Sequence, residues 1–364
     1  MKPKLYLAAG VVLTLAFVLV LGTAAAQPAS PCDIQFITLT GNTIRVSPTG
    51  VDDTANIQCA FDWAIDRGPG MTVRLTPGTF HTAQIYVYDF YGSFRGSGAD
   101  KTVIVNLPNL FVTPVNGWLN PPSSDNPLAI LFSFINGRVV IADLAIHIDD
   151  HDGHMTTGWA ISGDWGSYTF YEMDMAIVIT GTKAEALVTR ILIEGEPLAN
   201  YDFPYSLRNG IYYQGLYNEG LMSPVTGAYR VTNSTFKTMG SGTPLFNLKD
   251  ASVLVSHNTY EDGIYMMDVA DFVDSTIEIA SNQGETLIGM TFESGWLPEI
   301  TGTRIVVRNN EFAGNYGVIF WDTATFGVGN TCLIKSNDFR QILEGSVLLL
   351  GPGTDQCVLK NNKE

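Results

Sequence analysis

The sequence repeats itself with a period of about two dozen residues, and this repetition constrains the fold more than any other feature. Alternating apolar residues are followed by Asn and then, two places later, by an aromatic residue in Val253–Tyr260, Ile305–Phe312 and Cys332–Phe339, and more weakly in Val231–Phe236 and Ile277–Asn282. Equivalent positions are 24 to 28 residues apart, which is the length of one solenoid coil. The pattern predicts an all-β fold, a single-stranded right-handed parallel β-helix, with its clearest coils over about 228–364.

The repeated Asn and aromatic residues have a structural explanation. A sharp corner between two short strands needs local hydrogen bonding and a residue that tolerates left-handed dihedrals, and Asn supplies both. We expect the stacked Asn side chains to bond one another along the column, and the aromatic rings to stack in the core. A second apolar strand follows in each coil, and its outward positions predict a long face on which an extended ligand could lie.

A single amphipathic helix is expected before the coils, over about 53–67. Asp53 and Thr54 provide an N-cap, apolar residues recur with helical spacing, and Gly68-Pro69-Gly70 ends the segment. We expect this helix to cap the first coil and shield it from edge pairing.

The N-terminus has the features of a secretory signal. Lys2 and Lys4 precede an apolar run over 5–22, and the small residues Ala24-Ala25-Ala26 form a cleavage site, so residues 1–26 are interpreted as a signal peptide and 27–364 as the mature domain. The protein is then secreted, periplasmic or held at the cell surface. An uncleaved membrane anchor is the alternative, since the apolar run is almost long enough to span a bilayer.

The charge of the chain argues against nucleic acid as a partner. The sequence has 20 basic and 36 acidic residues, a formal charge of −16, and loss of Lys2 and Lys4 makes the mature charge −18. Phosphate binding needs a basic footprint, which this composition does not suggest.

The four cysteines favour disulfides, because an even count is typical of an exported protein. We expect Cys32 to pair with Cys59 and Cys332 with Cys357. The six residues that begin at each of the last two cysteines align without gaps, 25 residues apart. A coil of that length would stack the two sulfurs on adjacent strands about 4.8 Å apart, within the range that a disulfide accepts.

Residues 51–65 and 70–80 resemble the N-terminal module of pectate-lyase-superfamily β-helices, and the later coils resemble the parallel β-helix repeat that follows it. The resemblance covers most of the mature chain and implies the fold. It implies no single activity, because the superfamily includes polysaccharide lyases, glycoside hydrolases, epimerases, phage tailspikes and non-catalytic proteins. The Arg motif of the pectate lyases is missing. Of the polygalacturonase-type motifs only Asp149-Asp150 and Gly153-His154 have counterparts, so no catalytic residue is carried over.

A cluster of titratable residues is the main candidate site. The segment 147–154 holds three of the five histidines and three carboxylates. The strand over 141–146 aligns with 188–193 one coil later, which places His147 beside Glu194 and Asp149 beside Glu196. Such a group could place an acid and a base around a glycosidic bond, or bind Ca²⁺ through Asp149 and Glu194. The catalytic candidates are Asp149, Asp150, His154, Glu194 and Glu196. A solvated loop rich in Asp and His is the alternative.

Aromatic residues beside this cluster are candidates for substrate binding. Tyr205, Arg208 and Tyr212 lie in a Tyr-rich stretch, and aromatic faces with an adjacent guanidinium suit sugar rings and uronate carboxylates. Core packing is expected to account for some of these aromatics.

Asp268 and Asp322 form a third group, at matching ends of two second strands, two coils or about 9.6 Å apart. This separation is near the upper limit for an inverting carboxylate pair. We favour a structural interpretation, in which Lys249 lies one coil from Asp268 and neutralises it.

Two functions remain open from the sequence. The first is a carbohydrate-active enzyme, a polysaccharide lyase or glycoside hydrolase that acts on an extracellular glycan. The second is a non-catalytic surface or glycan-binding β-helix. The sequence also ends at Glu364 within an expected coil, which favours a truncated C-terminus over a last strand covered by another chain.

Overall fold

The computed structural model describes residues 35–107, 130–149, 158–161, 168–171, 175–196, 209–218, 221–294 and 297–364. In chain order the elements are β1 (Ile37–Thr40), β2 (Thr43–Val46), α1 (Thr54–Arg67), β3 (Thr72–Leu75), β4 (Gly78–Thr82), β5 (Ile85–Tyr88), β6 (Tyr91–Arg95), β7 (Thr102–Asn106), β8 (Ile130–Ile148), β9 (Gly158–Ile161), β10 (Tyr168–Tyr171), β11 (Met175–Gly195), β12 (Asn209–Gln214), β13 (Leu216–Asn218), β14 (Leu221–Ser223), β15 (Val225–Thr232), β16 (Thr235–Lys237), β17 (Leu245–Ser256), β18 (Thr259–Val273), β19 (Thr276–Ala280), β20 (Gln283–Glu293), β21 (Arg304–Arg308), β22 (Glu311–Phe320), β23 (Thr331–Lys335), β24 (Asp338–Leu349), the 3₁₀ turn η1 (Thr354–Gln356) and β25 (Val358–Lys360). The predicted signal peptide over 1–26 lies outside the described residues. In the part of the chain that is described, no helix has the length and apolarity needed to cross a membrane.

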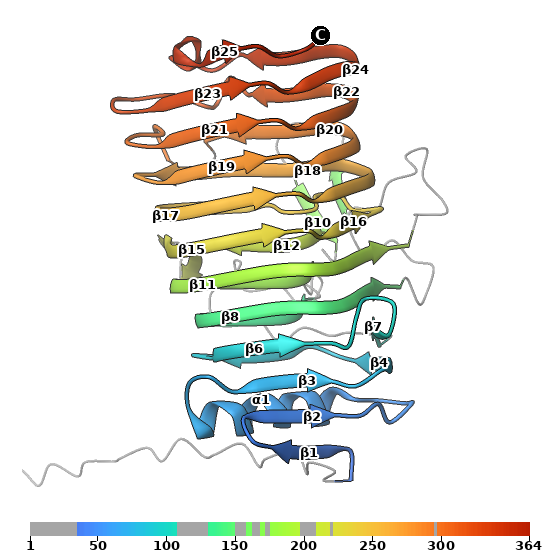
Figure 1. The fold of residues 1–364 in the computed structure, drawn as a ribbon. Coiled ribbons are helices and arrows are strands. Elements are labelled where there is room, and N and C mark those ends of the chain that lie inside the picture. Colours follow the sequence, from blue (N-terminus) through green and yellow to red (C-terminus); the bar gives the residue numbers. More distant parts are fainter. Residues whose placement is uncertain are drawn as a thin grey trace, which may run out of the picture.

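The strands stack in parallel, coil upon coil, into a solenoid (Figure 1). The nearer strands run from left to right in Figure 1 and the chain returns behind them as it climbs, so the winding is right-handed. The predicted right-handed parallel β-helix is confirmed. Alternate side chains of each strand point inward and fill one continuous core.

Each coil contributes to three sheets, because the longest strands bend round corners. The front sheet contains β2, β3, β6, the middle of β8, the middle of β11, β15, the end of β17, β19, β21, β23 and β25. The side sheet contains β4, β7, the ends of β8 and β11, β16 and the starts of β18, β20, β22 and β24. The back sheet contains β5, the starts of β8 and β11, β12, the start of β17 and the ends of β18, β20, β22 and β24.

An asparagine ladder holds the corner between the front and side sheets. Along the column, each Asn Nδ2 donates to the Oδ1 of the next Asn at 3.0 to 3.2 Å, and also to a backbone carbonyl of the front sheet. The column consists of Asn258, Asn282, Asn310, Asn337 and Asn362. The predicted bonding between stacked Asn side chains is confirmed.

The prediction that the ladder Asn residues adopt left-handed dihedrals is wrong by one residue. The left-handed position is the one before the ladder, for example His257, Ser281 and Asn309, with φ of 57°, 58° and 56°. Asn258, Asn282, Asn310 and Asn337 are instead buried, and Asn362 at the end of the ladder is half-buried. Their amides serve as hydrogen-bonding groups for the turning backbone.

The aromatic residues after the ladder stack in the core as predicted. Phe236 and Tyr260 lie 5.0 Å apart with an interplanar angle of 13°, and Phe312 and Phe339 repeat this geometry at 5.0 Å and 11°. The coil between them has Gly284 at the same position, paired with Tyr260 on one side and Phe312 on the other.

Helix α1 forms where the sequence predicted it and packs beneath the back sheet. Its Gln58 side chain accepts a hydrogen bond from the Tyr86 N–H at 3.0 Å and donates to the Tyr86 carbonyl at 2.8 Å, as a neighbouring strand would. Thr54 Oγ1 accepts from the Ala83 N–H at 2.7 Å. These bonds join the helix to the segment around β5, whereas β2 of the antiparallel β1–β2 hairpin pairs with β3 in the front sheet. That the helix caps the solenoid stays a prediction.

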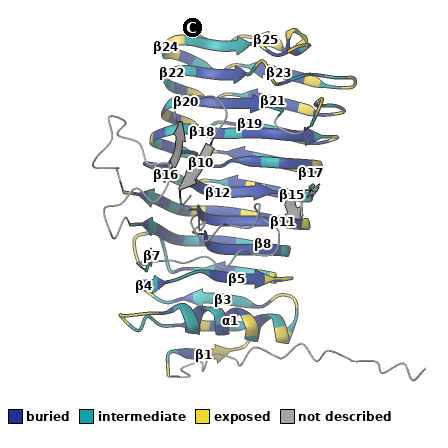
Figure 2. Cartoon of the chain, turned by 180° about the vertical axis from the view of Figure 1, so that it is seen from behind, coloured by how far each residue is buried: buried dark blue, intermediate teal, exposed yellow. Residues whose placement is uncertain are grey.

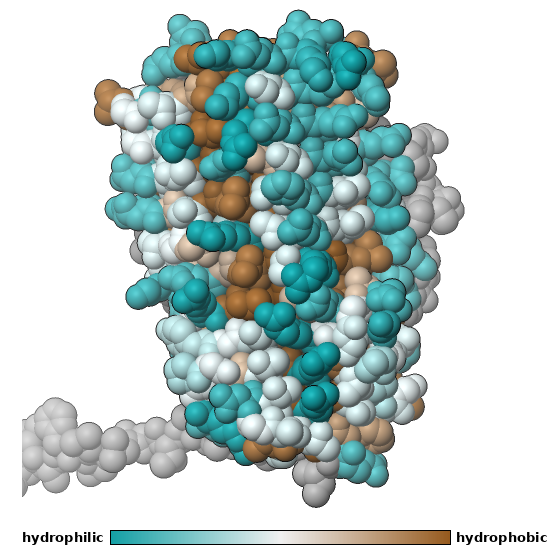
Figure 3. All heavy atoms as spheres, in the orientation of Figure 1, coloured by the Kyte–Doolittle hydropathy of each residue, from teal (hydrophilic) through white to brown (hydrophobic). Residues whose placement is uncertain are grey.

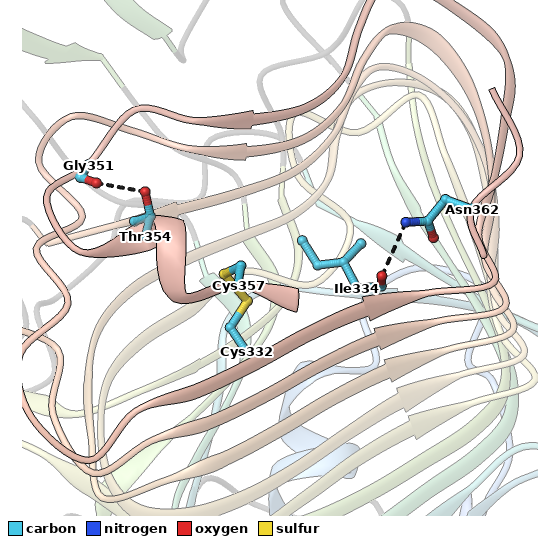
Figure 4. Close-up of a disulfide and its surroundings, with 6 residues drawn as sticks. All are labelled: Cys332, Ile334, Gly351, Thr354, Cys357 and Asn362. Carbon is cyan, nitrogen blue, oxygen red and sulfur yellow. Dashed lines mark hydrogen bonds between the residues drawn. A yellow bond between two sulfur atoms is a disulfide. The ribbon is translucent and has the colours of Figure 1, made fainter. Parts of the chain in front are cut away.

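The predicted disulfide Cys332–Cys357 joins the last two coils, with a Cα–Cα distance of 4.5 Å (Figure 4). On the other side of the same coil, Asn362 Nδ2 donates to the Ile334 carbonyl at 3.1 Å and ends the ladder. Cys59 is also disulfide-bonded, and Cys32 lies outside the described residues, so that pairing stays a prediction.

Candidate functional site

The predicted register of the His147 cluster is confirmed. On the outer surface of the side sheet, His147 at the end of β8 pairs with Glu194 of β11, and Nε2 lies 3.5 Å from Oε2. Both side chains are about two-fifths exposed, at 38% and 41%. The same outward row continues to Lys237 and Glu261, whose charged atoms are 2.9 Å apart. His147 and Glu194 thus belong to an outward row in which basic and acidic side chains alternate.

Asp149 is held by its backbone. The buried Asn106 side chain accepts from the Asp149 N–H at 2.7 Å and donates to the Asp149 carbonyl at 3.0 Å. Glu196 continues the register one coil later, since its N–H donates to the Ile148 carbonyl at 3.2 Å. The predicted neighbours Asp149 and Glu196 therefore leave their strands at the same level of the side sheet.

The other predicted site residues can be placed only in part. Asp150, His154, Tyr205 and Arg208 lie outside the described residues, so their roles stay predictions. Within the described ranges, no group of three or more His, Cys, Asp or Glu side chains is arranged to hold a metal ion, and Ca²⁺ binding by Asp149 and Glu194 also stays a prediction.

Tyr212 belongs to an apolar patch on the outward face of the back sheet. Its ring stacks on Phe246 at 5.6 Å and 18° and is only 7% exposed. Burial raises the pKa of its phenol far above the usual range, with a smaller contribution from the charge of Asp268. The patch consists of Ile130, Met175, Val178, Tyr212 and Phe246. Tyr212 therefore packs within the back sheet, and contact with a substrate stays a prediction.

Two carboxylic acids stand beside this patch on the same face of the back sheet. Asp268 lies on β18 and Glu293 on β20, the neighbouring strand (Figure 2). Glu293 is in register with Ala270, two residues beyond Asp268. Two residues along a strand and one strand spacing across give about 8 Å between the two Cα atoms. We call these two residues the carboxyl pair.

Burial and like charge perturb both members of the carboxyl pair. Burial raises the pKa of Asp268 to about 6, although Thr291 Oγ1 donates to its Oδ1 at 2.6 Å and opposes this shift. Burial also raises the pKa of Glu293 to about 7, and the negative charges of Asp268 and Asp271 raise it further. Near neutral pH one carboxyl of the pair therefore retains a proton while the other is ionised, which suits a general acid and a general base.

Aromatic residues surround the carboxyl pair. Burial and the charges of Asp268 and Glu293 raise the pKa of Tyr265 to about 12, so its phenol stays protonated as a hydrogen-bond donor. Trp321 follows Glu293 along the same outward row, since its N–H donates to the Phe292 carbonyl at 3.0 Å and Phe292 pairs with Phe320. On the other side, Phe246 pairs with Ala270. The row thus carries an aromatic residue on each side of the carboxyl pair.

The sequence interpretation of Asp268 is wrong in two respects. Lys249 pairs with Val273, five residues from Asp268, so it does not neutralise this carboxylate. Asp268 is in register with Thr291 and, two coils on, with Ile319, which excludes the proposed alignment with Asp322. The partner of Asp268 is the neighbouring Glu293, which the sequence interpretation missed. An alignment of Met267 with Met290 would have revealed this neighbour. These two residues are in register, and that register places Glu293 beside Ala270, two residues beyond Asp268.

No protein-family model matches the sequence, and no curated protein does. The fold is similar to a polygalacturonase from Erwinia carotovora ssp. carotovora at 12% identity and a TM-score of 0.46, over 88% of this chain and 97% of that one. An exopolygalacturonase from Thermotoga maritima is similar at 12% identity and a TM-score of 0.43, over 86% and 90% of the two chains. A mannuronan C-5 epimerase module from Azotobacter vinelandii has 12% identity and a TM-score of 0.39, over 87% and 95%. At this level of similarity the neighbours support no argument about activity, which has to come from the residues.

Proposed function

We propose that this protein is an exported glycoside hydrolase that cleaves a polysaccharide lying along the outward face of the back sheet. The observation that carries the proposal is the carboxyl pair, with pKa values raised to about 6 and 7 on adjacent strands. Export rests on the predicted signal peptide over 1–26.

The two carboxyls take different roles. Glu293, with the higher pKa, donates its proton to the glycosidic oxygen as the bond to the anomeric carbon breaks. Asp268, ionised, removes a proton from the water that attacks the anomeric carbon from the opposite face. Water adds across the glycosidic bond, and the pair regains its starting state after one proton returns to Glu293. This is the inverting mechanism, which needs about 6.5 to 9.5 Å between the two carboxyl groups so that the water fits between them.

The aromatic residues on either side position the sugar. Trp321 and Phe246 lie in the same outward row as Glu293, three coil spacings apart, and the C–H faces of pyranose rings pack on such aromatic rings. A chain that follows this row would place one glycosidic bond at the carboxyl pair.

The test is a panel of polysaccharides assayed for new reducing ends and for unsaturated uronate, with and without a calcium chelator. On a glycan that the protein cleaves, Asp268→Asn and Glu293→Gln are expected to lower kcat by about 10² to 10⁴ without changing Tm by more than a few degrees. Asp149→Asn and Glu194→Gln serve as matched controls, since they change the cluster on the side sheet. Full activity of Asp268→Asn and Glu293→Gln, with loss in the controls, would move the active site to that cluster.

A non-catalytic glycan-binding protein is the other function left open by the sequence. Binding to a glycan array with no new reducing ends and no unsaturated product would support it and overturn the hydrolase.

A further inference from the structure

The outward rows of the front sheet concentrate positive charge on an acidic protein. They carry nine of the 20 basic residues of the sequence but only two of its 36 acidic residues. The basic residues are Arg45, Arg74, Arg95, Arg138, Arg230, Arg304, Arg308, Lys335 and Lys360. Both acidic residues are already paired, Glu185 with Arg138 at 3.6 Å and Glu278 with Arg308 at 2.6 Å.

Two basic ladders stand at the ends of one outward row. Arg45, Arg74 and Arg95 are in register on β2, β3 and β6, and Arg308, Lys335 and Lys360 are in register on β21, β23 and β25. Like charges on adjacent strands, about 4.8 Å apart, destabilise a sheet. Asp143 lies 3.5 Å from Arg95 and is already bound by Arg190 at 2.7 Å, so it compensates the first ladder only in part. Binding of an external anion would relieve the repulsion between the like charges of each ladder.

The neighbouring outward row of the front sheet carries six apolar residues, of which Val306 is buried, with Arg230 and Glu278 between them. Its apolar members are Val140, Leu187, Leu254, Val306, Leu333 and Val358. Leu187 and Val358 are 36% and 56% exposed. Figure 3 shows this face, with a strip of apolar atoms running up it between strongly hydrophilic side chains.

We propose that the front sheet is a docking surface for an anionic lipid bilayer. Apolar side chains beside a row that carries two basic ladders, on one face of a sheet, fit the headgroup region, where lipid phosphates pair with the cations. Sugar rings and unstacked bases are held by aromatic faces, but Tyr91 is the one aromatic residue at the outward positions of the described front sheet.

This surface is independent of the proposed hydrolase, since the carboxyl pair lies on the back sheet. The test is sedimentation of the full chain with vesicles of phosphatidylglycerol or of phosphatidylcholine, at low and high salt. The measured quantity is the partition coefficient for phosphatidylglycerol vesicles divided by that for phosphatidylcholine vesicles. Any binding through the N-terminal apolar segment contributes to both coefficients and therefore cancels in the ratio. We expect the wild type to prefer the anionic vesicles and to lose that preference at high salt.

Substitution of the first ladder supplies the decisive comparison. Arg45→Gln, Arg74→Gln and Arg95→Gln combined are expected to lower the ratio about a hundredfold, at roughly fivefold for each cation. The matched control combines Arg67→Gln, Lys101→Gln and Lys249→Gln, which removes three cations outside the front sheet and should leave the ratio within about twofold. Equal losses in the two triple variants, or no preference of the wild type for anionic vesicles, would overturn the proposal. So would ladder-dependent binding to a soluble anionic polysaccharide or to single-stranded DNA in place of vesicles.

Discussion

Asn310 offers the sharpest test of how the asparagine ladder stabilises the solenoid. Its Oδ1 accepts from the Asn282 backbone N–H at 2.9 Å and from Asn282 Nδ2 at 3.0 Å, while its Nδ2 donates to the Ile279 carbonyl and to Asn337 Oδ1, both at 3.0 Å. The side chain is only 1% exposed, so water does not replace it. Asn310→Ala removes all four hydrogen bonds.

The magnitude follows from these bonds. At about 1 kcal/mol net for each hydrogen bond, the four bonds contribute about 4 kcal/mol to stability. The substitution also leaves the Asn282 N–H and the Ile279 carbonyl buried without partners, which is unfavourable in itself. We expect Asn310→Ala to lower the free energy of unfolding by about 4 kcal/mol, measured by urea unfolding followed by circular dichroism. Unchanged m-values will show that the same region unfolds in both proteins.

The adjacent Asn309 supplies the control. It is exposed and has φ of 56°, which glycine adopts without strain, so Asn309→Gly should cost less than about 1 kcal/mol. A cost below about 1 kcal/mol for Asn310→Ala, or equal costs for the two variants, would refute the argument that the ladder stabilises the coils through its buried hydrogen bonds.

Three further predictions concern stability. Cys332→Ser should lower the free energy of unfolding by about 3.5 kcal/mol, because the disulfide closes a loop with a sequence separation of 25 and its loss restores that loop entropy to the unfolded chain. In urea unfolding, a reducing agent should then have a smaller effect on the variant than on the wild type. The pKa of Asp268 is raised from 3.8 in the unfolded chain to about 6 in the folded protein, so the folded state binds more protons between these two pH values. The contribution of Asp268 to stability therefore falls as the pH rises from about 4 to 6. Thermal melts should show Asp268→Asn stabilised relative to the wild type at pH 8 and not at pH 4. Gly314→Ala should cost about 3 kcal/mol or more, because φ is 145° and the new Cβ would collide with the Thr286 carbonyl oxygen, and a denaturation midpoint close to that of the wild type would contradict this.

The features that could be predicted from sequence are those that recur in every coil. The period of the repeat predicted the parallel solenoid, and the aligned cysteines predicted the disulfide Cys332–Cys357. The alternation of apolar residues around Ile141 and Val188 predicted that His147 lies beside Glu194. Each of these depends on residues that face the core or the corner, where packing repeats from coil to coil.

The carboxyl pair could not be predicted in the same way, because it depends on the back sheet. The segments between the regular strands differ in length from coil to coil, so an alignment by strand ends moved Asp268 by three residues and paired it with Asp322 in place of Ile319. The raised pKa values arise from burial and from neighbouring charges across strands, neither of which is visible in the sequence alone. The basic front face was hidden for a similar reason, since its cations are scattered over 316 positions of an acidic chain between Arg45 and Lys360.

The most direct test of the proposed hydrolase is the pH dependence of kcat/KM on a glycan that the protein cleaves, because this ratio reports the pKa values of the free enzyme. The raised pKa values predict a narrow bell, which rises as Asp268 ionises near pH 6 and falls as Glu293 loses its proton near pH 7; as the two groups interact, the limbs belong to the pair. Residual activity of Asp268→Asn should lose the acidic limb, and that of Glu293→Gln the alkaline limb. A bell that persists unchanged in both variants would contradict the assignment of the carboxyl pair as the catalytic acid and base.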